Sequence, residues 1–212
     1  MALKIYFLRH GETAYSKTGD FCGWVDEPLT AEGKLMAEDF ATAYGGIKWE
    51  AIYSSPMKRT VETAQPVSLK TGVEIQLREG LKEINYGKWE LKSHTEIKAD
   101  YKADYEKWVS EPGWNSPTEG ETAFQIAERS CAVIQEALAK HVDGAVLFVS
   151  HKATIRIMLC SLLGIELGRY RDRVNALTGS VSLVTFDQHG PRLDILGDRN
   201  HLREELRSRE GT

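Results

Sequence analysis

The sequence contains little cysteine, and no two cysteines lie close together. Among its 212 residues there are three, Cys22, Cys131 and Cys160, and none belongs to a Cys-x-x-Cys pair. An odd and widely spaced set argues against a disulfide framework and against a zinc site built from paired thiolates. Reduced thiols in a cytoplasmic protein are the plain interpretation, so we expect a cytoplasmic location.

Long apolar runs and an excess of positive charge are also absent. No stretch reaches the roughly eighteen apolar residues that a membrane-spanning helix needs, so no membrane span is predicted. The first residues, 1–4, lead into an apolar run without the pattern of a signal peptide. The 27 lysines and arginines face 31 aspartates and glutamates, a formal net charge of −4. This balance argues against a nucleic-acid-binding protein with a broad basic face.

The motifs of three other phosphate-handling chemistries are missing as well. No cysteine is followed by an arginine six positions later, which excludes the loop of the cysteine-dependent phosphatases. The sequence also has no Walker A loop and no Asp-x-Asp pair for an aspartyl-phosphate enzyme. What is present is ordinary globular composition, 42% apolar and 27% charged, in a chain long enough to bury a core.

Segments typical of strands and of helices alternate along most of the chain. Six apolar runs predict strands, and they lie at 3–8, 51–54, 74–77, 145–149, 180–186 and 192–196. This alternation predicts an α/β fold, a three-layer α/β/α sandwich with a mostly parallel central sheet. A segment rich in tryptophan and tyrosine, about 84–121, predicts a helical insertion with one helix at 94–110. We expect a single domain, 1–212, in which this insertion forms part of the pocket mouth.

Polar side chains follow several of these strands. Arg9 and His10 come directly after the first strand, Arg59 lies shortly beyond the second, and His151 follows the fourth. Because ligands in such folds bind beyond the carboxyl ends of strands, we expect these side chains to share one crevice. A neutral imidazole is a nucleophile and arginines match phosphoryl oxygens, so the cluster suits phosphoryl transfer without a metal. Glu83, after the third strand, is placed to supply a proton to the leaving oxygen.

Six short blocks occur in an order that covers nearly the whole chain. They are Leu8–Thr13, Gly23–Thr30, Ser54–Thr60, Glu83–Gly87, Gly120–Thr122 and Ser150–His151. In content and order they resemble the motifs of the histidine phosphatase superfamily, in its phosphoglycerate-mutase-like branch. Within that branch, the metal-independent phosphoserine phosphatases are similar in length and motif order. Arg-His-Gly alone is weak evidence, whereas the ordered set is very specific.

The resemblance implies a role for each residue that matches a motif. His10 is the implied nucleophile that becomes phosphorylated, and Arg9, Arg59 and His151 are the implied holders of the phosphoryl oxygens. Glu83 is the implied acid that protonates the leaving group and then takes a proton from the attacking water. No metal and no cofactor are expected at this site.

Four more residues are expected to line the substrate pocket: Ser16, Cys22, Gly23 and Lys152. Serine stands at position 16 where the family often has asparagine, and lysine stands at 152 where it usually has glycine. A cation in the first turn of a helix opposes the helix dipole, which indicates a compensating anion nearby. Whether Lys152 meets a substrate carboxylate or is solvated stays open. The basic run of Arg169, Arg171 and Arg173 is typical of a solvated face from which one arginine can reach the site.

The predicted function is hydrolysis of a small soluble phosphate ester through a phosphohistidine intermediate. Phosphoserine or another carboxylate-bearing ester is the favoured substrate. Two alternatives stay open: a phosphoglycerate mutase acting on the same site, and a non-enzymatic module that binds a phosphorylated ligand. The intact set of catalytic residues counts against the second. The expected partner is the small-molecule ester, with no nucleic acid and no membrane, and a homodimer stays open.

Overall fold

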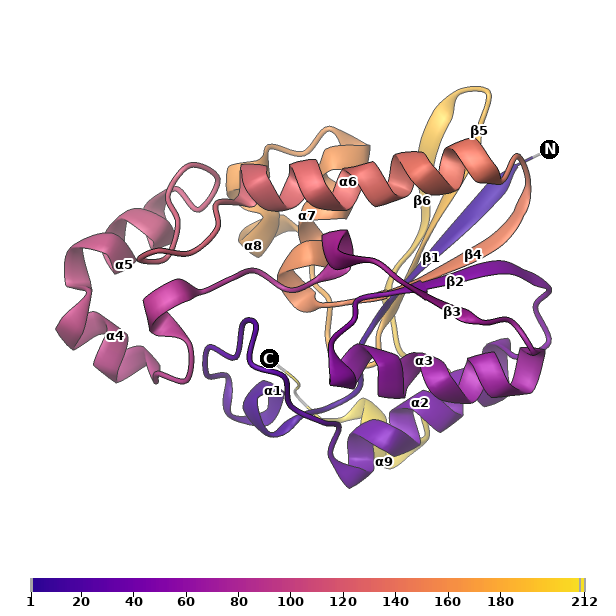
Figure 1. Ribbon diagram of the computed structural model, residues 1–212, viewed down its shortest axis with the longest axis horizontal. Helices are drawn as coiled ribbons and strands as arrows, with labels where there is room; N and C mark the ends of the chain where they lie inside the picture. Colours follow the sequence, from indigo (N-terminus) through magenta and orange to yellow (C-terminus); the bar gives the residue numbers. More distant parts are fainter. Residues whose placement is uncertain (1, 210, 212) are drawn as a thin grey trace.

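The computed structural model describes residues 2–209 and 211, and a mixed sheet of six strands runs through the centre of this part of the chain (Figure 1). The strands are β1 (Leu3–Arg9), β2 (Trp49–Ser54), β3 (Ile75–Leu77), β4 (Gly144–Ser150), β5 (Val181–Asp187) and β6 (Gly190–Asp198). Their order is β3-β2-β4-β1-β5-β6, in which the first four are parallel and β5 is antiparallel to both of its neighbours. All six predicted strands are therefore present.

Helices cover both faces of the sheet, which confirms the predicted three-layer architecture (Figure 1). The larger helices are α2 (Ala31–Tyr44) and α3 (Lys58–Thr71) on one face, and α6 (Ala123–Lys140) and α7 (Lys152–Leu163) on the other. The shorter elements are α1 (Ala14–Thr18), η1 (Glu79–Leu81), η3 (Leu167–Arg169), α8 (Tyr170–Arg173) and α9 (Glu204–Arg207). Among the described helices, none combines the length and the apolar character that crossing a bilayer requires.

The alternating apolar side chains of β1 explain why both faces are covered. Ile5 and Phe7 are fully buried in the core beneath α6 and α7, while Tyr6 and Leu8 pack in the core beneath α2 and α3. Because successive side chains of a strand point to opposite faces, a fully apolar strand must be covered on both sides.

The register of the parallel strands sets the position of the functional residues. Arg9 at the end of β1 pairs with Ser150 at the end of β4, and Ser54 at the end of β2 pairs with Val149. The carboxyl ends of three adjacent strands therefore lie at one edge of the sheet. The residues that follow them, His10, Ser55 and His151, begin loops at that same edge.

The insertion forms a small core of its own beside this edge. It contains η2 (Gly87–Trp89), α4 (His94–Asp100) and α5 (Lys102–Ser110), which Figure 1 shows projecting from the sheet. The prediction of a single helix at 94–110 is wrong. Tyr101 takes non-helical angles, φ −131° and ψ 33°, and separates α4 from α5. Phe21 joins the core of the insertion from the loop after α1.

Candidate active site

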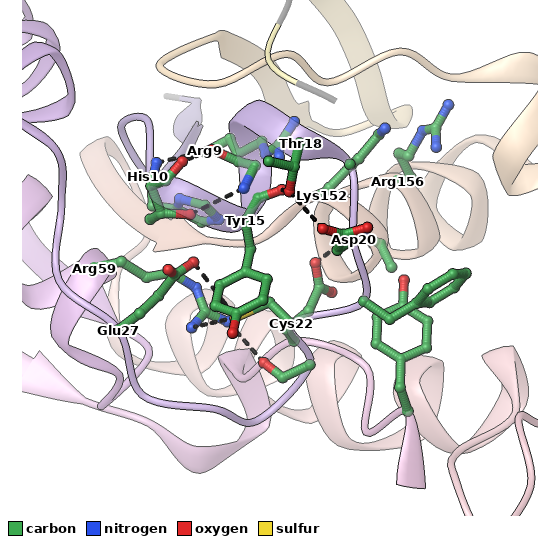
Figure 2. Close-up of a pocket in the computed structure, with 18 of the residues that line it drawn as sticks. Arg9, His10, Tyr15, Thr18, Asp20, Cys22, Glu27, Arg59, Lys152 and Arg156 are labelled. Atoms are coloured by element: carbon green, nitrogen blue, oxygen red, sulfur yellow. Dashed lines mark hydrogen bonds between the residues drawn. The ribbon is translucent and has the colours of Figure 1, made fainter. Parts of the chain in front are cut away.

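A pocket of about 430 Å³ lies at the carboxyl ends of the parallel strands (Figure 2). Arg9, His10, Arg59 and Glu83 all line it, so the structure brings together four of the five residues predicted to act in catalysis. Ser16, Cys22, Gly23 and Lys152, predicted to line the substrate pocket, line it as well.

One ring nitrogen of His10 makes a hydrogen bond with the backbone, and the other keeps its lone pair. Its Nδ1 lies 2.8 Å from the carbonyl oxygen of Gly11, and a carbonyl can only accept, so Nδ1 carries the proton. Burial, and then the charges of Arg59 and Arg9, lower the pKa of His10 well below its usual value. The ring is therefore neutral at pH 7, with its nucleophilic lone pair on Nε2.

His151 lies beside His10, with ring centroids 5.2 Å apart. Its Nδ1 accepts from Arg59 Nε over 3.1 Å, so Nε2 carries the proton and donates to Ser55 Oγ over 2.9 Å. Burial, and then the charge of Arg59, lower its pKa well below the usual value. The ring is fully buried and does not itself line the pocket defined by residues 2–209 and 211. Direct contact between His151 and a phosphoryl group stays a prediction.

The guanidinium of Arg59 is held by acceptors from three segments. These acceptors are His151 Nδ1 (3.1 Å), Val25 O (2.9 Å), Gly23 O (2.8 Å), Met57 Sδ (3.3 Å) and Cys22 Sγ (3.9 Å). The two sulfur atoms are weak acceptors, and a phosphoryl oxygen is a much stronger one. An arriving phosphoryl group can therefore replace the sulfur contacts while the carbonyls keep the guanidinium in place.

Arg9 supplies the second buried guanidinium of the pocket. Its Nη1 donates to Ala176 O over 2.8 Å and to Gly211 O over 3.4 Å. Burial lowers the pKa of Arg9 to about 9, which still leaves it charged at pH 7. Together, Arg9 and Arg59 give the pocket floor the positive charge that a phosphoryl dianion requires.

The carboxylate of Glu83 sits at the N-terminus of α7. Its oxygens accept from the backbone N–H groups of Ala153 and Thr154, each over 3.3 Å, and from that of Ile84 over 2.9 Å. An anion at this end of a helix is stabilised by the helix dipole. The acidic side chain that the structure places at this helix end, near Lys152, is therefore Glu83.

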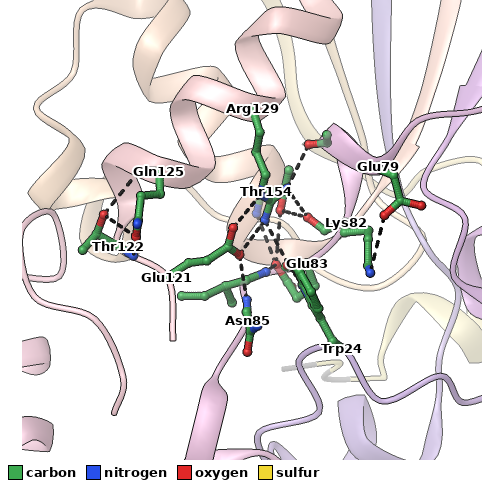
Figure 3. A network of polar contacts seen from close by, with 12 residues as sticks. Trp24, Glu79, Lys82, Glu83, Asn85, Glu121, Thr122, Gln125, Arg129 and Thr154 are labelled. Atoms are coloured by element: carbon green, nitrogen blue, oxygen red, sulfur yellow. Dashed lines mark hydrogen bonds and ion pairs between the residues drawn. The ribbon is translucent and has the colours of Figure 1, made fainter. Parts of the chain in front are cut away.

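The backbone around Glu83 is held by Arg129 of α6 (Figure 3). The guanidinium donates to the carbonyls of Gly80, Lys82 and Glu83 over 2.9, 2.8 and 3.0 Å, and it pairs with Glu121 over 2.8 Å. Sequence reasoning missed this contact, because Arg129 lies 46 residues from Glu83 in the chain.

Glu121 also ties together the two ends of the insertion. It accepts from the backbone N–H of Asn85 over 2.9 Å, and its own N–H donates to Asn85 O over 2.9 Å. Arg129, Glu121 and Asn85 therefore form one network (Figure 3).

The surroundings of three predicted pocket residues, Ser16, Cys22 and Gly23, differ from one another. Ser16 is buried and exchanges hydrogen bonds with Thr13 in the capping box of α1. Burial raises the pKa of the Cys22 thiol to about 12, so this thiol stays protonated. Gly23 has φ +53°, a conformation that L side chains rarely adopt, and a Cβ there would lie 2.3 Å from Glu90 Oε1, so glycine is favoured.

Sequence reasoning did not assign Arg156 to the pocket, which it lines. The signal was its spacing of four residues from Lys152, because residues at i and i+4 share a helix face. Arg171 lines the pocket too, and it is the member of the basic run that reaches the site.

The family model of the histidine phosphatase superfamily, branch 1, matches residues 5–199. The chain belongs to this family. Phosphoserine phosphatase 1 of Hydrogenobacter thermophilus is 30% identical over 79% of this chain and 80% of the relative. A probable phosphoglycerate mutase, GpmB of Escherichia fergusonii, is 26% identical over 94% of this chain and 95% of the relative.

A solved structure of Bacillus stearothermophilus YhfR is similar to this chain with a TM-score of 0.88 and 26% identity, covering 95% of this chain and 100% of the other. The histidine phosphatase fold predicted from the motifs is therefore confirmed. The chain is an enzyme of this family, whose relatives carry the names of phosphatases and of mutases.

Proposed function

We propose that the chain is a metal-independent phosphomonoesterase that works through a phosphohistidine on His10. The observation that carries this proposal is the neutral His10 ring, whose Nδ1 is bound to Gly11 O and whose Nε2 keeps its lone pair in a pocket with two guanidinium groups. A nucleophile without charge can approach a phosphoryl dianion, and the guanidinium groups stabilise the charge of the transition state.

The reaction consists of two displacements at one phosphorus atom. In the first, Nε2 of His10 bonds to phosphorus, the ester P–O bond breaks, and Glu83, which begins this step in its protonated form, gives its proton to the leaving oxygen. In the second, water attacks phosphorus, the P–N bond breaks, and Glu83 takes the proton of the water. Phosphate leaves, and His10 and Glu83 return to their starting states. Arg9, Arg59 and His151 support the phosphoryl group throughout.

The substrate that we favour is phosphoserine or another small ester with a carboxylate. Lys152 supports this choice, since it is a half-buried cation of the pocket that makes no ion pair within the described residues. The name of the phosphoserine phosphatase relative supports it too. The name of the mutase relative keeps phosphoglycerate mutase as the second candidate.

A panel of phosphate esters tests the proposed function. Phosphate release and acid-labile labelling of His10 are measured for phosphoserine, 3-phosphoglycerate, glucose 6-phosphate and nitrophenyl phosphate. Fast phosphate release with transient labelling supports the phosphatase. Transfer of the label to a second phosphoglycerate, with little phosphate released, would instead identify a mutase.

Metal independence gives a separate prediction. No cluster of three or more histidine, cysteine or carboxylate side chains suited to a metal ion occurs in residues 2–209 and 211. Two guanidinium groups on the pocket floor also repel a cation. We expect full phosphatase activity in excess EDTA, measured against the same enzyme with added Mg²⁺ or Mn²⁺. A strict need for either ion would contradict the mechanism.

A further inference from the structure

A second group of cations lines the pocket apart from Arg9 and Arg59. Lys152 and Arg156 lie four residues apart on α7, and Arg171 comes from α8. Figure 2 shows Lys152 and Arg156 extending from the same helix. Two helices therefore place three positive side chains at one part of the pocket wall, which we call the distal cations.

The protein itself fixes two of the distal cations. Arg156 donates through Nε to Val174 O and through Nη2 to Arg171 O, the second over 2.8 Å. The guanidinium carbon of Arg171 lies 4.0 Å from the centroid of the Trp108 ring, where cation–π attraction holds it. Both guanidinium groups are thus ordered before any ligand arrives, which lowers the entropy lost on binding.

The carboxylates of the pocket make their described hydrogen bonds with other partners than the distal cations. Glu83 accepts backbone hydrogen bonds at α7, Glu27 accepts from the Cys22 thiol, and Asp20 accepts from Thr18. In residues 2–209 and 211, neither Lys152 nor Arg156 forms an ion pair with any of these three. Lys152 and Arg156 therefore remain able to pair with an anionic group of a ligand.

We propose that Lys152, Arg156 and Arg171 form a subsite for a second anionic group of the substrate, so that the pocket selects phosphate esters that carry another negative charge. This inference rests on the proposed phosphatase function and specifies its substrate class. The anionic group is a carboxylate or a second phosphate, since both accept several hydrogen bonds from guanidinium and ammonium groups. Binding such a group removes the mutual repulsion of the distal cations.

Matched pairs of esters test the subsite. Phosphoserine is compared with phosphoethanolamine, which lacks only the carboxylate, and fructose 1,6-bisphosphate with fructose 6-phosphate, which lacks the second phosphate. We expect the wild-type enzyme to prefer the more anionic member of at least one pair by about tenfold or more in kcat/KM, the effect of a hydrogen bond to a charged group. The pair that shows the preference identifies the anion.

Three variants assign the preference to the distal cations. Lys152→Gln and Arg171→Gln should each lower it by about tenfold, mainly through KM. Arg173→Gln is the matched control, because Arg173 lies in the same helix, is exposed and does not line the pocket. A preference that is absent from the wild type, or equal in all three variants, would overturn the subsite.

Two readouts separate this proposal from the proposed function. Labelling of His10 by nitrophenyl phosphate tests the phosphatase and needs no second anion. Calorimetric binding of both ester pairs to the His10→Ala variant tests the subsite without turnover. Equal affinities within both pairs would reject the subsite even where labelling supports the phosphatase, and tighter binding of the more anionic member of either pair would support the subsite even where labelling fails.

The titration of Lys152 adds a pH prediction. Burial and the charges of Arg9, Arg156 and Arg171 lower its pKa to about 8, against the opposing effect of Glu83. Lys152 is charged below this pH and loses its charge as the pH rises through it. The preference for 3-phosphoglycerate over glycerol 3-phosphate should therefore fall above about pH 8. It should persist to higher pH in Lys152→Arg, whose guanidinium stays protonated.

Discussion

Replacing His10 by alanine is expected to lower kcat by about 10⁴-fold or more, the scale of losing a covalent nucleophile. The effect is large because the other ring of the cluster, His151, has its Nδ1 bound to Arg59 and is fully buried. It cannot replace His10 as nucleophile. Turnover of phosphoserine and of nitrophenyl phosphate is measured together with acid-labile labelling, which should vanish.

A matched histidine serves as the control for this experiment. His189 is exposed in the turn between β5 and β6, so His189→Ala should retain wild-type kcat. Thermal unfolding of both variants checks the fold, which should survive because the only hydrogen bond described for the His10 side chain is to Gly11 O. A folded His10→Ala enzyme with near-normal turnover would show that another group is phosphorylated.

The second large effect is expected from Glu83→Gln, and it should depend on the leaving group. A glutamine cannot donate an acidic proton. Turnover of phosphoserine, from which serine would have to leave as an alkoxide, should therefore fall by about 10² to 10⁴-fold. Nitrophenolate leaves without protonation, and labelling of His10 by nitrophenyl phosphate should proceed at a near-normal rate. Rapid-mixing measurements of that labelling separate the first displacement from the second.

The second displacement should slow for both esters, because both form the same phosphohistidine and the variant lacks a base for water. The intermediate should therefore accumulate. Glu27→Gln is the control, since it makes the same substitution in the same pocket and Glu27 has no assigned proton transfer. Equal loss of labelling rate with good and poor leaving groups would contradict the role of Glu83 as general acid.

The strands, and the position of the functional residues at their ends, were predictable because both have local signals in the sequence. A run such as 145–149 is apolar throughout, and a strand with two apolar faces must lie in the middle of a covered sheet. The ends of β1, β2 and β4 then fall at one edge, which brings Arg9, His10 and Arg59 into one pocket without knowledge of any side-chain conformation.

Contacts between distant segments could not be predicted in the same way. The tautomer of His10 depends on the geometry of Gly11 O, and that of His151 depends on Arg59, 92 residues away. The dipole argument for Lys152 predicts an anion nearby without naming it, and the acidic side chain at that helix end is Glu83, which is 70 residues from its partner Ala153. The hydrophobic periodicity of the sequence carries no information on contacts between distant segments, because it describes one helix or strand at a time.

The clasp formed by Arg129, Glu121 and Asn85 separates the position of Glu83 from the length of the insertion. Asn85 and Glu121 join the two ends of the insertion, and Arg129 fixes Glu83 from α6, a helix that does not line the described pocket. Closing a loop whose ends already meet adds little entropy cost as its length changes. A change in the length of the insertion should therefore leave Glu83 in place, so that the part of the pocket lined by the insertion can vary separately from the acid.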